Sequence, residues 1–530
     1  MAKRLVSGVR SGAAVVIALT VVSVVGGSNP RRATVDVGAR NEVMTLRAAT
    51  LAVAGCTAGM DSDYNGDGVR DIAIADPEAV VSGHDKAGLI RVAYGGTGTV
   101  QTITESTART LSGSEAGDRF GHALATYDVN RDGCSDLVVG TPYEDLNGLA
   151  DVGSVYVLLG APGGLTTGVE SLTWHQEVGA TADTVEVGDQ FGYSVAAGQI
   201  AAGEGYLVIG APGEDLGTAV DAGLVHYIRG TVNVGIDQAL TGTTDSNETN
   251  DRFGFSVSGS PEHIVAGRPG EGVDAAGFAG AVGVYTHDLL SGKPKLIGDV
   301  KSGNPQADEY FGKSTSVVVY RPAGAPVGHR GSLIAVGVPG TDWQPSAGVI
   351  ARDAGAVEIY EATMTGVVRV QPVWDQAVAG PTSPRPGHVT NYQQDGAYFG
   401  ERVRLFNSNP GAEATSQSVL LAVGVPGWDA QGTLDAGKVR VLFPTVAEGP
   451  TTIARSTASL PGTPVAAELL GTALGASGQH LYLGSPYGNP AVYALPWSDL
   501  AIGTVTPTLV WKPGAGGIPP GEAAFGAAIG

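Results

Sequence analysis

The chain has 530 residues and a formal net charge of −21, and 43% of its residues are hydrophobic. This hydrophobic content excludes a wholly disordered protein, and the negative charge argues against nucleic acid as the main partner, because phosphates are bound by clustered lysines and arginines. Solubility together with metal ligation accounts for the acidity. The 81 glycines follow no collagen period and alternate with Val, Leu, Ile and Tyr, a pattern that predicts many short strands joined by tight turns.

The N-terminus has the composition of an export signal. Basic residues precede an apolar run over residues 13–25, which Gly-Gly-Ser-Asn-Pro breaks. The run is shorter than the roughly 20 residues of a membrane-spanning helix but fits the core of a signal peptide, with a retained anchor as the alternative. We therefore predict a signal peptide at 1–30, a disordered linker at 31–50, and a secreted protein with no membrane span after signal removal.

The chain has two cysteines, Cys56 and Cys134. In an exported protein two thiols are more often bridged than free. The stretch VAGC that ends at Cys56 resembles a lipoprotein cleavage box. Such a box directly follows an apolar core, however, and here the core ends about thirty residues earlier. A Cys56–Cys134 disulfide is the favoured hypothesis.

A punctuated repeat runs through the chain. Copies begin with Phe-Gly, at Phe120, Phe191, Phe253, Phe311, Phe399 and Phe525, with a weakened Leu-Gly copy at Leu470. Each copy except the last continues into an apolar run that ends in Gly-x-Pro. The prolines at these ends, including an early version without the glycine, are Pro77, Pro142, Pro212, Pro269, Pro339, Pro426 and Pro486. They lie between 57 and 87 residues apart, which indicates an array of similar units.

Four short strands are predicted in each unit. A third run follows the loop after Gly-x-Pro, as in LIRVAYGG and GSVYVLLG, and it alternates like a half-buried strand. Weaker fourth runs such as VQTITES have the composition of outer edge strands. Four strands in each of seven units predict an all-β fold, a seven-bladed β-propeller over residues 51–530. The first unit lacks Phe-Gly, so we expect the terminal FGAAIG at 525–530 to join blade one and close the ring.

The pattern D-x-N-x-D-G-x-x-D occurs twice and predicts two Ca²⁺ sites. Side-chain oxygens at positions 1, 3, 5 and 9 and a main-chain carbonyl at position 7 can surround one ion, and glycine at position 6 permits the sharp turn. The predicted ligands are Asp63, Asn65, Asp67, Val69 and Asp71 in one loop, and Asp128, Asn130, Asp132, Cys134 and Asp136 in the other. An EF-hand is excluded, because its position 12 is glutamate and these loops have Ile74 and Val139. The alternative is an Asx-rich turn without metal.

Phe-Gly, an acidic loop and Gly-x-Pro in this order resemble the FG-GAP repeats of the integrin α-chain N-terminal propeller, which related exported bacterial proteins also carry. The resemblance covers residues 51–530. It implies a calcium-stabilised binding platform with the acidic loops on the lower face, although two units alone keep the loop, and it does not imply the ligand. The repeats also resemble the propeller attached to some phospholipase D enzymes, so a hydrolase acting on phosphodiesters or esters is a further hypothesis.

No catalytic residue is assigned, because the sequence has neither G-x-S-x-G nor H-E-x-x-H.

Strand alternation places the loops after Gly-x-Pro and before Phe-Gly on the face opposite the acidic loops. Aromatic residues on exposed loops are typical anchors for a partner, which selects Tyr143, Trp343, Tyr392 and Trp428. The alternative is that the acids of these loops cap turns and the rings cover the blade ends.

Together these patterns predict a monomeric, exported, calcium-binding propeller that acts as an adhesion or recognition module. The expected ligand is a protein or a cell surface, which includes glycans. Carbohydrate binding is the second hypothesis, and hydrolysis by side chains around the central channel is the third.

Overall fold

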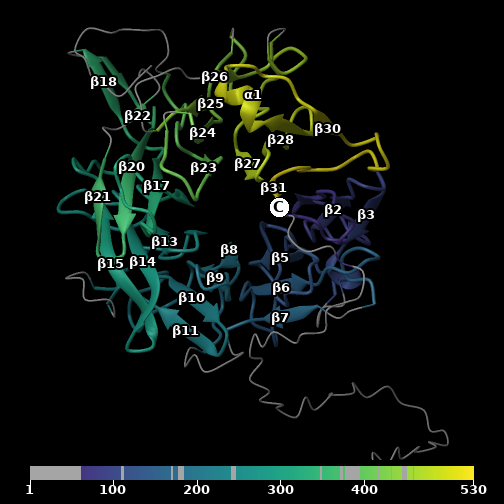
Figure 1. Ribbon diagram of the computed structural model, residues 1–530, viewed down its shortest axis with the longest axis horizontal. Coiled ribbons are helices and arrows are strands. Elements are labelled where there is room, and N and C mark those ends of the chain that lie inside the picture. Colours follow the sequence, from purple (N-terminus) through teal and green to yellow (C-terminus); the bar gives the residue numbers. More distant parts are fainter. Residues whose placement is uncertain are drawn as a thin grey trace, which may run out of the picture. The chain divides into compact units, whose positions relative to one another are not determined.

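Seven antiparallel sheets form most of the described part of the chain in the computed structural model (Figure 1). The structure describes Cys56 and residues 61–108, 113–168, 171–176, 184–239, 246–346, 349–370, 374–375, 394–415, 417–430, 432–444, 451–456 and 459–530. All of them belong to one compact unit, Val43–Gly530. The predicted signal peptide and linker lie outside the described residues. Within the described ranges, no helix is both long enough and apolar enough to cross a bilayer.

Each sheet is one blade of four main strands, which are named in order from the inner strand outward. Blade one consists of β31 (Ala528–Ile529), β1 (Ile72–Asp76), β2 (Leu89–Ala93) and β3 (Val100–Ile103). Blade two consists of β4 (Ala123–Tyr127), β5 (Asp136–Thr141), β6 (Ser154–Leu158) and β7 (Leu172–Trp174). Blade three consists of β8 (Ser194–Gln199), β9 (Gly205–Ala211), β10 (Leu224–Arg229) and β11 (Val232–Ile236).

The other four blades follow the same plan. Blade four consists of β12 (Ser256–Gly259), β13 (His263–Arg268), β14 (Ala281–Leu290) and β15 (Lys293–Lys301). Blade five consists of β16 (Ser314–Val319), β17 (Gly331–Val338), β20 (Ala356–Thr363) and β21 (Gly366–Arg369), with β22 (Trp374–Asp375) also paired to β20. Blade six consists of β23 (Val403–Asn407), β24 (Val419–Val425), β25 (Lys438–Leu442) and β26 (Thr451–Ile453). Blade seven consists of β27 (Ala473–Ala476), β28 (His480–Ser485), β29 (Ala491–Pro496) and β30 (Leu509–Trp511).

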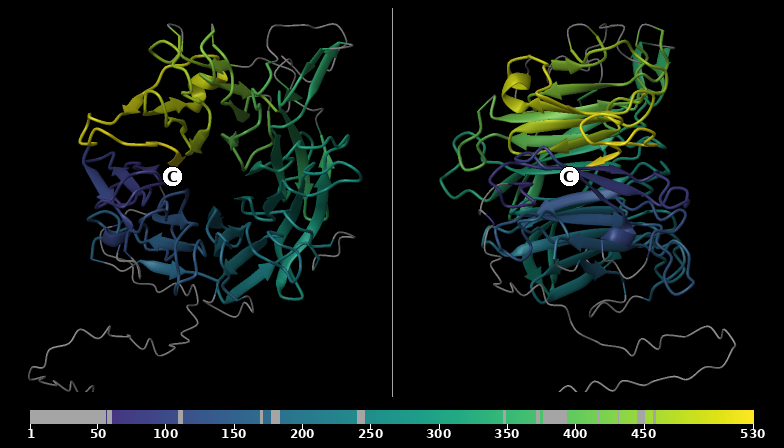
Figure 2. Two further views of the ribbon diagram at one scale, coloured as in Figure 1. Left: turned by 180° about the vertical axis from the view of Figure 1, so that it is seen from behind. Right: turned by 90° about the vertical axis from the view of Figure 1, so that its right-hand side faces the viewer.

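The blades form a closed ring, which confirms the seven-bladed propeller predicted from the repeat (Figure 1; Figure 2). The inner strands are neighbours in the order β4, β8, β12, β16, β23, β27, β31 and back to β4. Strand β31 pairs with β1, with Ile529 opposite Ile74 and Ala528 opposite Ala75. The C-terminal strand thus supplies the inner position that the first unit lacks, as predicted.

The Phe-Gly and Gly-x-Pro motifs meet where one blade packs on the next. The phenylalanines of Phe-Gly are buried, and their main chain is bonded to the preceding blade, as when Phe191 N donates to the Val152 carbonyl oxygen at 2.9 Å. The glycine of Gly-x-Pro lies against the following Phe-Gly: a Cβ on Gly140 would lie 2.1 Å from the Gly192 carbonyl oxygen. A side chain there would push the blades apart, so the close approach of two backbones explains why the repeat keeps glycine.

The ring has an upper and a lower face. At the upper face the second strand of each blade ends in Gly-x-Pro and the inner strand begins, and at the lower face the inner strand turns into the second strand. Both acidic loops lie at the lower face, since each directly precedes a second strand, β1 or β5. The sequence did not predict the hairpin of β18 (Trp343–Ser346) and β19 (Val349–Ala351), the helix α1 (Trp497–Ala501) or the turn η1 (Glu105–Thr107).

A cluster of carboxyl groups is buried between blades one and two. Glu105, Asp118 and Glu144 place carboxylate oxygens within 4.8 Å of one another. Tyr156 OH donates to Glu105 Oε1 at 2.5 Å. Burial raises the pKa of Asp118 to about 7, and the negative charge of Glu105 adds to this effect.

The equivalent place between blades six and seven holds an ion pair. Arg455 and Glu468 are both buried, and Arg455 Nε donates to Glu468 Oε1 at 2.7 Å. Arg455 Nη1 also donates to Tyr493 OH at 2.5 Å, and Ser485 Oγ donates to Glu468 Oε1 at 2.7 Å. The buried carboxylate of Glu468 therefore has a cationic partner and additional hydrogen bonds, which a buried charge requires.

Candidate functional site

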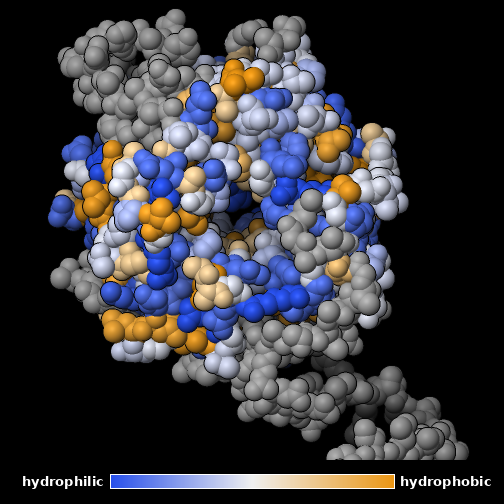
Figure 3. All heavy atoms as spheres, in the orientation of Figure 1, coloured by the Kyte–Doolittle hydropathy of each residue, from blue (hydrophilic) through white to orange (hydrophobic). Residues whose placement is uncertain are grey.

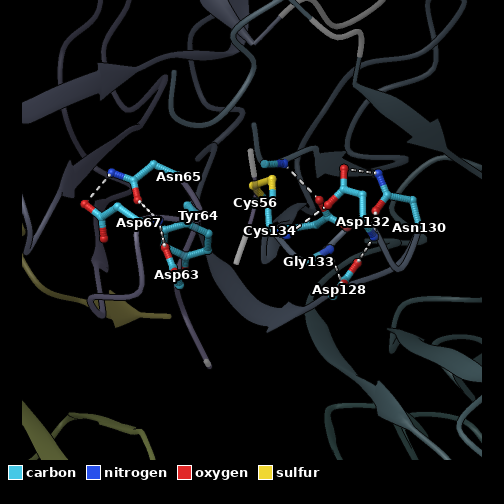
Figure 4. The surroundings of a disulfide bond; sticks show 12 residues. Cys56, Asp63, Tyr64, Asn65, Asp67, Asp128, Asn130, Asp132, Gly133 and Cys134 are labelled. Carbon is cyan, nitrogen blue, oxygen red and sulfur yellow. Dashed lines mark hydrogen bonds between the residues drawn. A yellow bond between two sulfur atoms is a disulfide. The ribbon is translucent and has the colours of Figure 1, made fainter. Parts of the chain in front are cut away.

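The first acidic loop winds around its own side-chain oxygens (Figure 4). Asp63 accepts hydrogen bonds from Asp67 N at 3.1 Å and from Gly68 N at 2.8 Å. Asn65 Oδ1 accepts from Asp67 N at 3.1 Å, and Asp67 Oδ1 accepts from Val69 N at 2.8 Å. The oxygens at positions 1, 3 and 5 therefore all lie on the inner side of one turn.

The second acidic loop repeats these contacts. Asp128 accepts from Asp132 N at 3.2 Å and from Gly133 N at 3.1 Å. Asn130 Oδ1 accepts from Asp132 N at 3.0 Å, and Asp132 Oδ1 accepts from Cys134 N at 2.9 Å. Because two loops in different blades share one set of bonds, the residue pattern itself determines their conformation.

The aspartates at position 9 attach the loops to their blades. Asp71 accepts from Tyr64 N and Gly95 N, both at 2.9 Å. Asp136 accepts in the same way from the main chain on either side, with the Val129 N bond at 2.7 Å. Burial raises the pKa of Asp71 to about 7 and that of Asp136 well above its ordinary value, and the charges of the other loop aspartates contribute to both shifts.

The donor set of each loop has the chemistry of a calcium site. It offers carboxylate, amide and carbonyl oxygens and no imidazole or free thiol, which is the set that Ca²⁺ prefers. The negative charges of the loop carboxylates repel one another, and a bound divalent cation offsets such repulsion. The oxygens of both loops accept hydrogen bonds from main-chain N–H groups. Among the described residues, the group of three carboxylates with oxygens within 4.8 Å of one another is Glu105, Asp118 and Glu144, which lies outside both loops.

A disulfide joins the second acidic loop to Cys56, which precedes the first loop in the chain (Figure 4). Cys56 and Cys134 are bridged, with their Cα atoms 5.3 Å apart, which confirms the predicted bond. Gly66 of the first loop packs on the bridge, since a Cβ there would lie 2.9 Å from Cys134 Sγ. The Asp63 carbonyl oxygen accepts from Ser135 N at 2.8 Å. The bridge and this bond make the two loops one structural unit at the border of blades one and two.

The aromatic residues predicted to contact a ligand have different surroundings. Trp428 packs against the core of blade six, and Lys438 Nζ lies 3.0 Å from its ring centroid. Tyr143 is half-buried, with Arg119 above its ring at 5.1 Å. Trp343 is half-buried at the start of β18, and Tyr392 lies outside the described residues. A binding role for these four residues stays a prediction.

The acids of the same upper loops bond to the turns around them. Asp145 Oδ1 accepts from Asp151 N at 3.0 Å, and Asp429 Oδ1 accepts from Asp435 N at 2.9 Å. Asp151 and Asp435 adopt positive φ angles of 55° and 52°, a conformation that aspartate tolerates better than most residues. Turn capping therefore accounts for these carboxylates.

Sequence reasoning missed a ring pair on the upper face, Phe278 and Tyr310, and the tyrosine that takes the place of Tyr310 in the next repeat, Tyr398. We call these three residues the upper aromatic patch. Phe278 is 42% exposed and Tyr398 is 40% exposed. The rings of Phe278 and Tyr310 have centroids 6.2 Å apart. Burial, and then charges that include Asp353, raise the pKa of both tyrosines. The available signal was position: both tyrosines directly precede Phe-Gly.

The inner strands enclose a cavity of about 540 Å³ at the centre of the ring. The space-filling view shows a hollow at the centre of the ring (Figure 3). Aromatic, basic and hydroxyl side chains line the cavity, among them His122, Tyr193, Lys313 and Arg402. Its size lies within the range of small-molecule sites in proteins. The third hypothesis, hydrolysis by side chains around the central channel, stays untested.

The fold and the repeated motifs define a class, the seven-bladed β-propellers built from FG-GAP repeats. The FG-GAP repeat family matches residues 120–158, from Phe-Gly of blade two through the second acidic loop to the end of β6. Integrin α chains are among the similar proteins, and this chain is an integrin-like FG-GAP propeller.

Three relatives illustrate the similarity. The chain is 33% identical over 156 residues to integrin alpha-PS2 of Drosophila melanogaster, which covers 28% of this chain and 10% of that protein. It is 36% identical over 107 residues to human phosphatidylinositol-glycan-specific phospholipase D, covering 19% of this chain and 13% of that protein. It is 30% identical over 162 residues to integrin alpha-5 of Xenopus laevis, covering 29% and 14%. The matched segments are thus a small part of each relative.

Proposed function

We propose that the propeller is a recognition module that binds a protein or cell-surface partner through the upper aromatic patch. The observation that carries this proposal is the exposure of Phe278 and Tyr398 on one face, together with the ring contact between Phe278 and Tyr310. Aromatic residues that lie together on a surface are characteristic of interface hot spots. The similarity to integrin α chains supports a role in adhesion.

The charges around the patch favour a partner with lysine or arginine side chains. Asp308 and Asp353 contribute negative charge at Tyr310, and Asp353 and Asp435 contribute it at Tyr398. A cation is attracted both to an aromatic face and to nearby carboxylates. The patch therefore combines an apolar anchor with a rim that selects positive charge.

The test is binding to immobilised extracellular-matrix proteins and to a glycan array. The variant Phe278→Ala/Tyr310→Ala/Tyr398→Ala should lose at least about tenfold in affinity, because hot-spot truncations each cost more than 1 kcal/mol. The matched control changes three exposed apolar residues elsewhere, Val327→Ala, Val368→Ala and Ile502→Ala. Equal binding by the patch variant and the control would remove the patch from the proposal.

We also propose that each acidic loop holds one Ca²⁺ that stabilises the border of blades one and two. The oxygen donor set supports this, and so do the like charges of the buried Asp63 and Asp71 and the neighbouring Asp67. Bound calcium at a hundred times its dissociation constant would stabilise the fold by about 2.7 kcal/mol. Calorimetry should find two ions, and Asp128→Asn should leave one, whereas the exposed Asp274→Asn should leave two. An equal melting temperature in calcium and in chelator would contradict the proposal.

A hydrolase acting on phosphodiesters or esters is the second candidate. The central cavity and the similarity to phosphatidylinositol-glycan-specific phospholipase D favour it. A substrate panel separates the candidates, because turnover that disappears when His122 is changed to Ala would promote the enzyme. Absence of turnover, with partner binding that depends on the upper aromatic patch, would favour recognition.

We further propose that the protein is exported and monomeric. The apolar run at 13–25 supports export, and so does the disulfide, because such bonds persist in oxidising compartments. N-terminal sequencing of protein recovered from the medium should begin near residue 30. Light scattering should give the mass of one chain.

A further inference from the structure

Blade six differs from every other blade where the inner strand faces the central cavity. Two positions of each inner strand, the second and fourth residues after Phe-Gly, are occupied by small side chains in six blades. These residues are Ala123 and Ala125, Ser194 and Ala196, Ser256 and Ser258, Ser314 and Ser316, Ala473 and Gly475, and Ala528 and Gly530. In blade six the same positions are Arg402 and Arg404, and both line the cavity.

Neither arginine has a carboxylate partner among the described residues. Arg402 Nε donates to the Thr472 carbonyl oxygen at 3.2 Å, and Arg404 Nη2 donates to the Leu474 carbonyl oxygen at 3.3 Å. The neighbouring Glu401 is paired with Lys313 at 3.0 Å instead. An arginine has five N–H donors in a fixed fork, so each guanidinium keeps further donors available toward the cavity.

The opposite side of the cavity carries two more polar groups. The rings of His122 and Tyr193 have centroids 4.8 Å apart, and both residues line the cavity. Burial, and then the positive charges of Arg402 and Arg119, lower the pKa of His122 to about 4. The charge of Arg402 on blade six therefore contributes to the lowered pKa of His122 on blade two, across the channel.

We propose that this channel binds an oxyanion, a phosphate or carboxylate group of a small molecule, between Arg402 and Arg404 on one side and His122 and Tyr193 on the other. Guanidinium groups recognise both anions through paired N–H donors. Arg402 is exposed to the cavity and Arg404 is half-buried beside it, so a bound anion can reach the first guanidinium and offset the charge of the second. A protein with a net charge of −21 otherwise repels anions, whereas Lys313, Arg402 and Arg404 outnumber the carboxylates Asp61 and Glu401 in the cavity lining. This site lies apart from the upper aromatic patch and does not depend on its function.

The direct test is calorimetric titration with inorganic phosphate, sulfate and succinate at constant ionic strength. Wild type should bind phosphate or succinate, and comparison of these two ligands identifies the preferred oxyanion. Arg402→Ser/Arg404→Ser introduces the residues that blade five has at these positions, so the fold should be retained. Affinity should fall at least about tenfold, because hydrogen bonds to charged groups are stronger than neutral ones. The control Arg321→Ser/Arg330→Ser removes two arginines outside the cavity and should bind as wild type does.

A second readout follows the imidazole itself. With selectively labelled histidine, phosphate should raise the pKa of His122 by about one unit or more, because a nearby opposite charge favours the charged form. The single variant Arg402→Ser should weaken this shift and serves if the double variant unfolds. The inference is overturned if none of the three anions binds to wild type, or if the double variant binds as well as the control.

Discussion

Blades one and two are joined differently from blades six and seven, although the repeat places equivalent residues at both borders. Arg455 and Glu468 neutralise each other between blades six and seven, whereas Glu105 and Asp118 occupy the same positions between blades one and two. The first border also has the disulfide between Cys56 and Cys134. The FG-GAP backbone therefore fixes where a polar side chain is buried between blades but not how its charge is balanced.

The intermediate borders support this conclusion. Between blades three and four the position of Arg455 is taken by Gln238, whose Nε2 donates to Asp251 Oδ2 at 2.6 Å. Gln176 occupies the same position between blades two and three, and it donates to Glu214. A neutral donor, a cation and a carboxyl group thus all fit one place, with different consequences for stability.

Deletion of residues 525–530 should have the largest effect, because β31 lies between blades seven and two and supports both borders. Phe525 is fully buried, and loss of one buried phenylalanine side chain alone costs about 3–5 kcal/mol. Differential scanning calorimetry should show a large fall in melting temperature or loss of the folded state. An exposed Lys512→Ala change is the control, and an unchanged transition after deletion would mean that ring closure does not depend on β31.

Replacing both cysteines should have the next largest effect. The bridge spans 78 residues, and a loop of this length corresponds to about 4 kcal/mol of lost stability in urea unfolding. Hydrogen exchange should rise first in the acidic loops of blades one and two, while Arg455 and its neighbours stay protected. Equal loss of protection at both borders would show that the disulfide stabilises the whole ring and not one border.

The sequence predicted those features that depend on residues close together in a repeat. Phe-Gly and Gly-x-Pro could be found because their glycines recur where two blade backbones approach closely, with Ala75 as the exception in blade one, and the disulfide could be found because two cysteines allow one intramolecular pair. The position of Tyr310 and Tyr398 before Phe-Gly was visible in the sequence, but their exposure was not, and neither was the pairing of Arg455 with Glu468. They depend on which strand ends meet in space and which side chains remain exposed, and neither is a property of a single repeat.

Arg455→Ala should destabilise the border of blades six and seven by about 3 kcal/mol, because it leaves a buried carboxylate without its cation. Glu468 is fully buried, so water cannot replace the lost guanidinium. The control is Arg330→Ala, whose side chain is 45% exposed and paired with Glu262, and an exposed pair is worth less than about 1 kcal/mol. Similar losses in the two variants by urea unfolding would refute the importance given to burial.

Glu105→Gln should have the smallest effect, and it should stabilise. Glutamine is the residue at this position in blades two and three, where it donates to a carboxylate. The substitution replaces one of three buried acids by a donor and should add about 1 kcal/mol at pH 8, the net worth of one hydrogen bond. The pKa of Asp118 is raised from 3.8 to about 7 in the folded protein. The stabilisation from its protonated form is therefore complete below about pH 4 and is lost as pH rises through 7.

Wild type should thus lose stability at this border between pH 5 and pH 8, and the variant should lose less. Burial raises the pKa values of Asp71 and Glu309 to about 7 as well, so the pH dependence of either protein alone does not isolate this cluster. The difference between variant and wild type does isolate it, because those groups are common to both. Unfolding free energies at pH 5 and pH 8, with the half-exposed Glu413→Gln as control, measure that difference. A variant less stable than wild type at pH 8 would show that the carboxylate of Glu105 stabilises this border more than the amide of glutamine does.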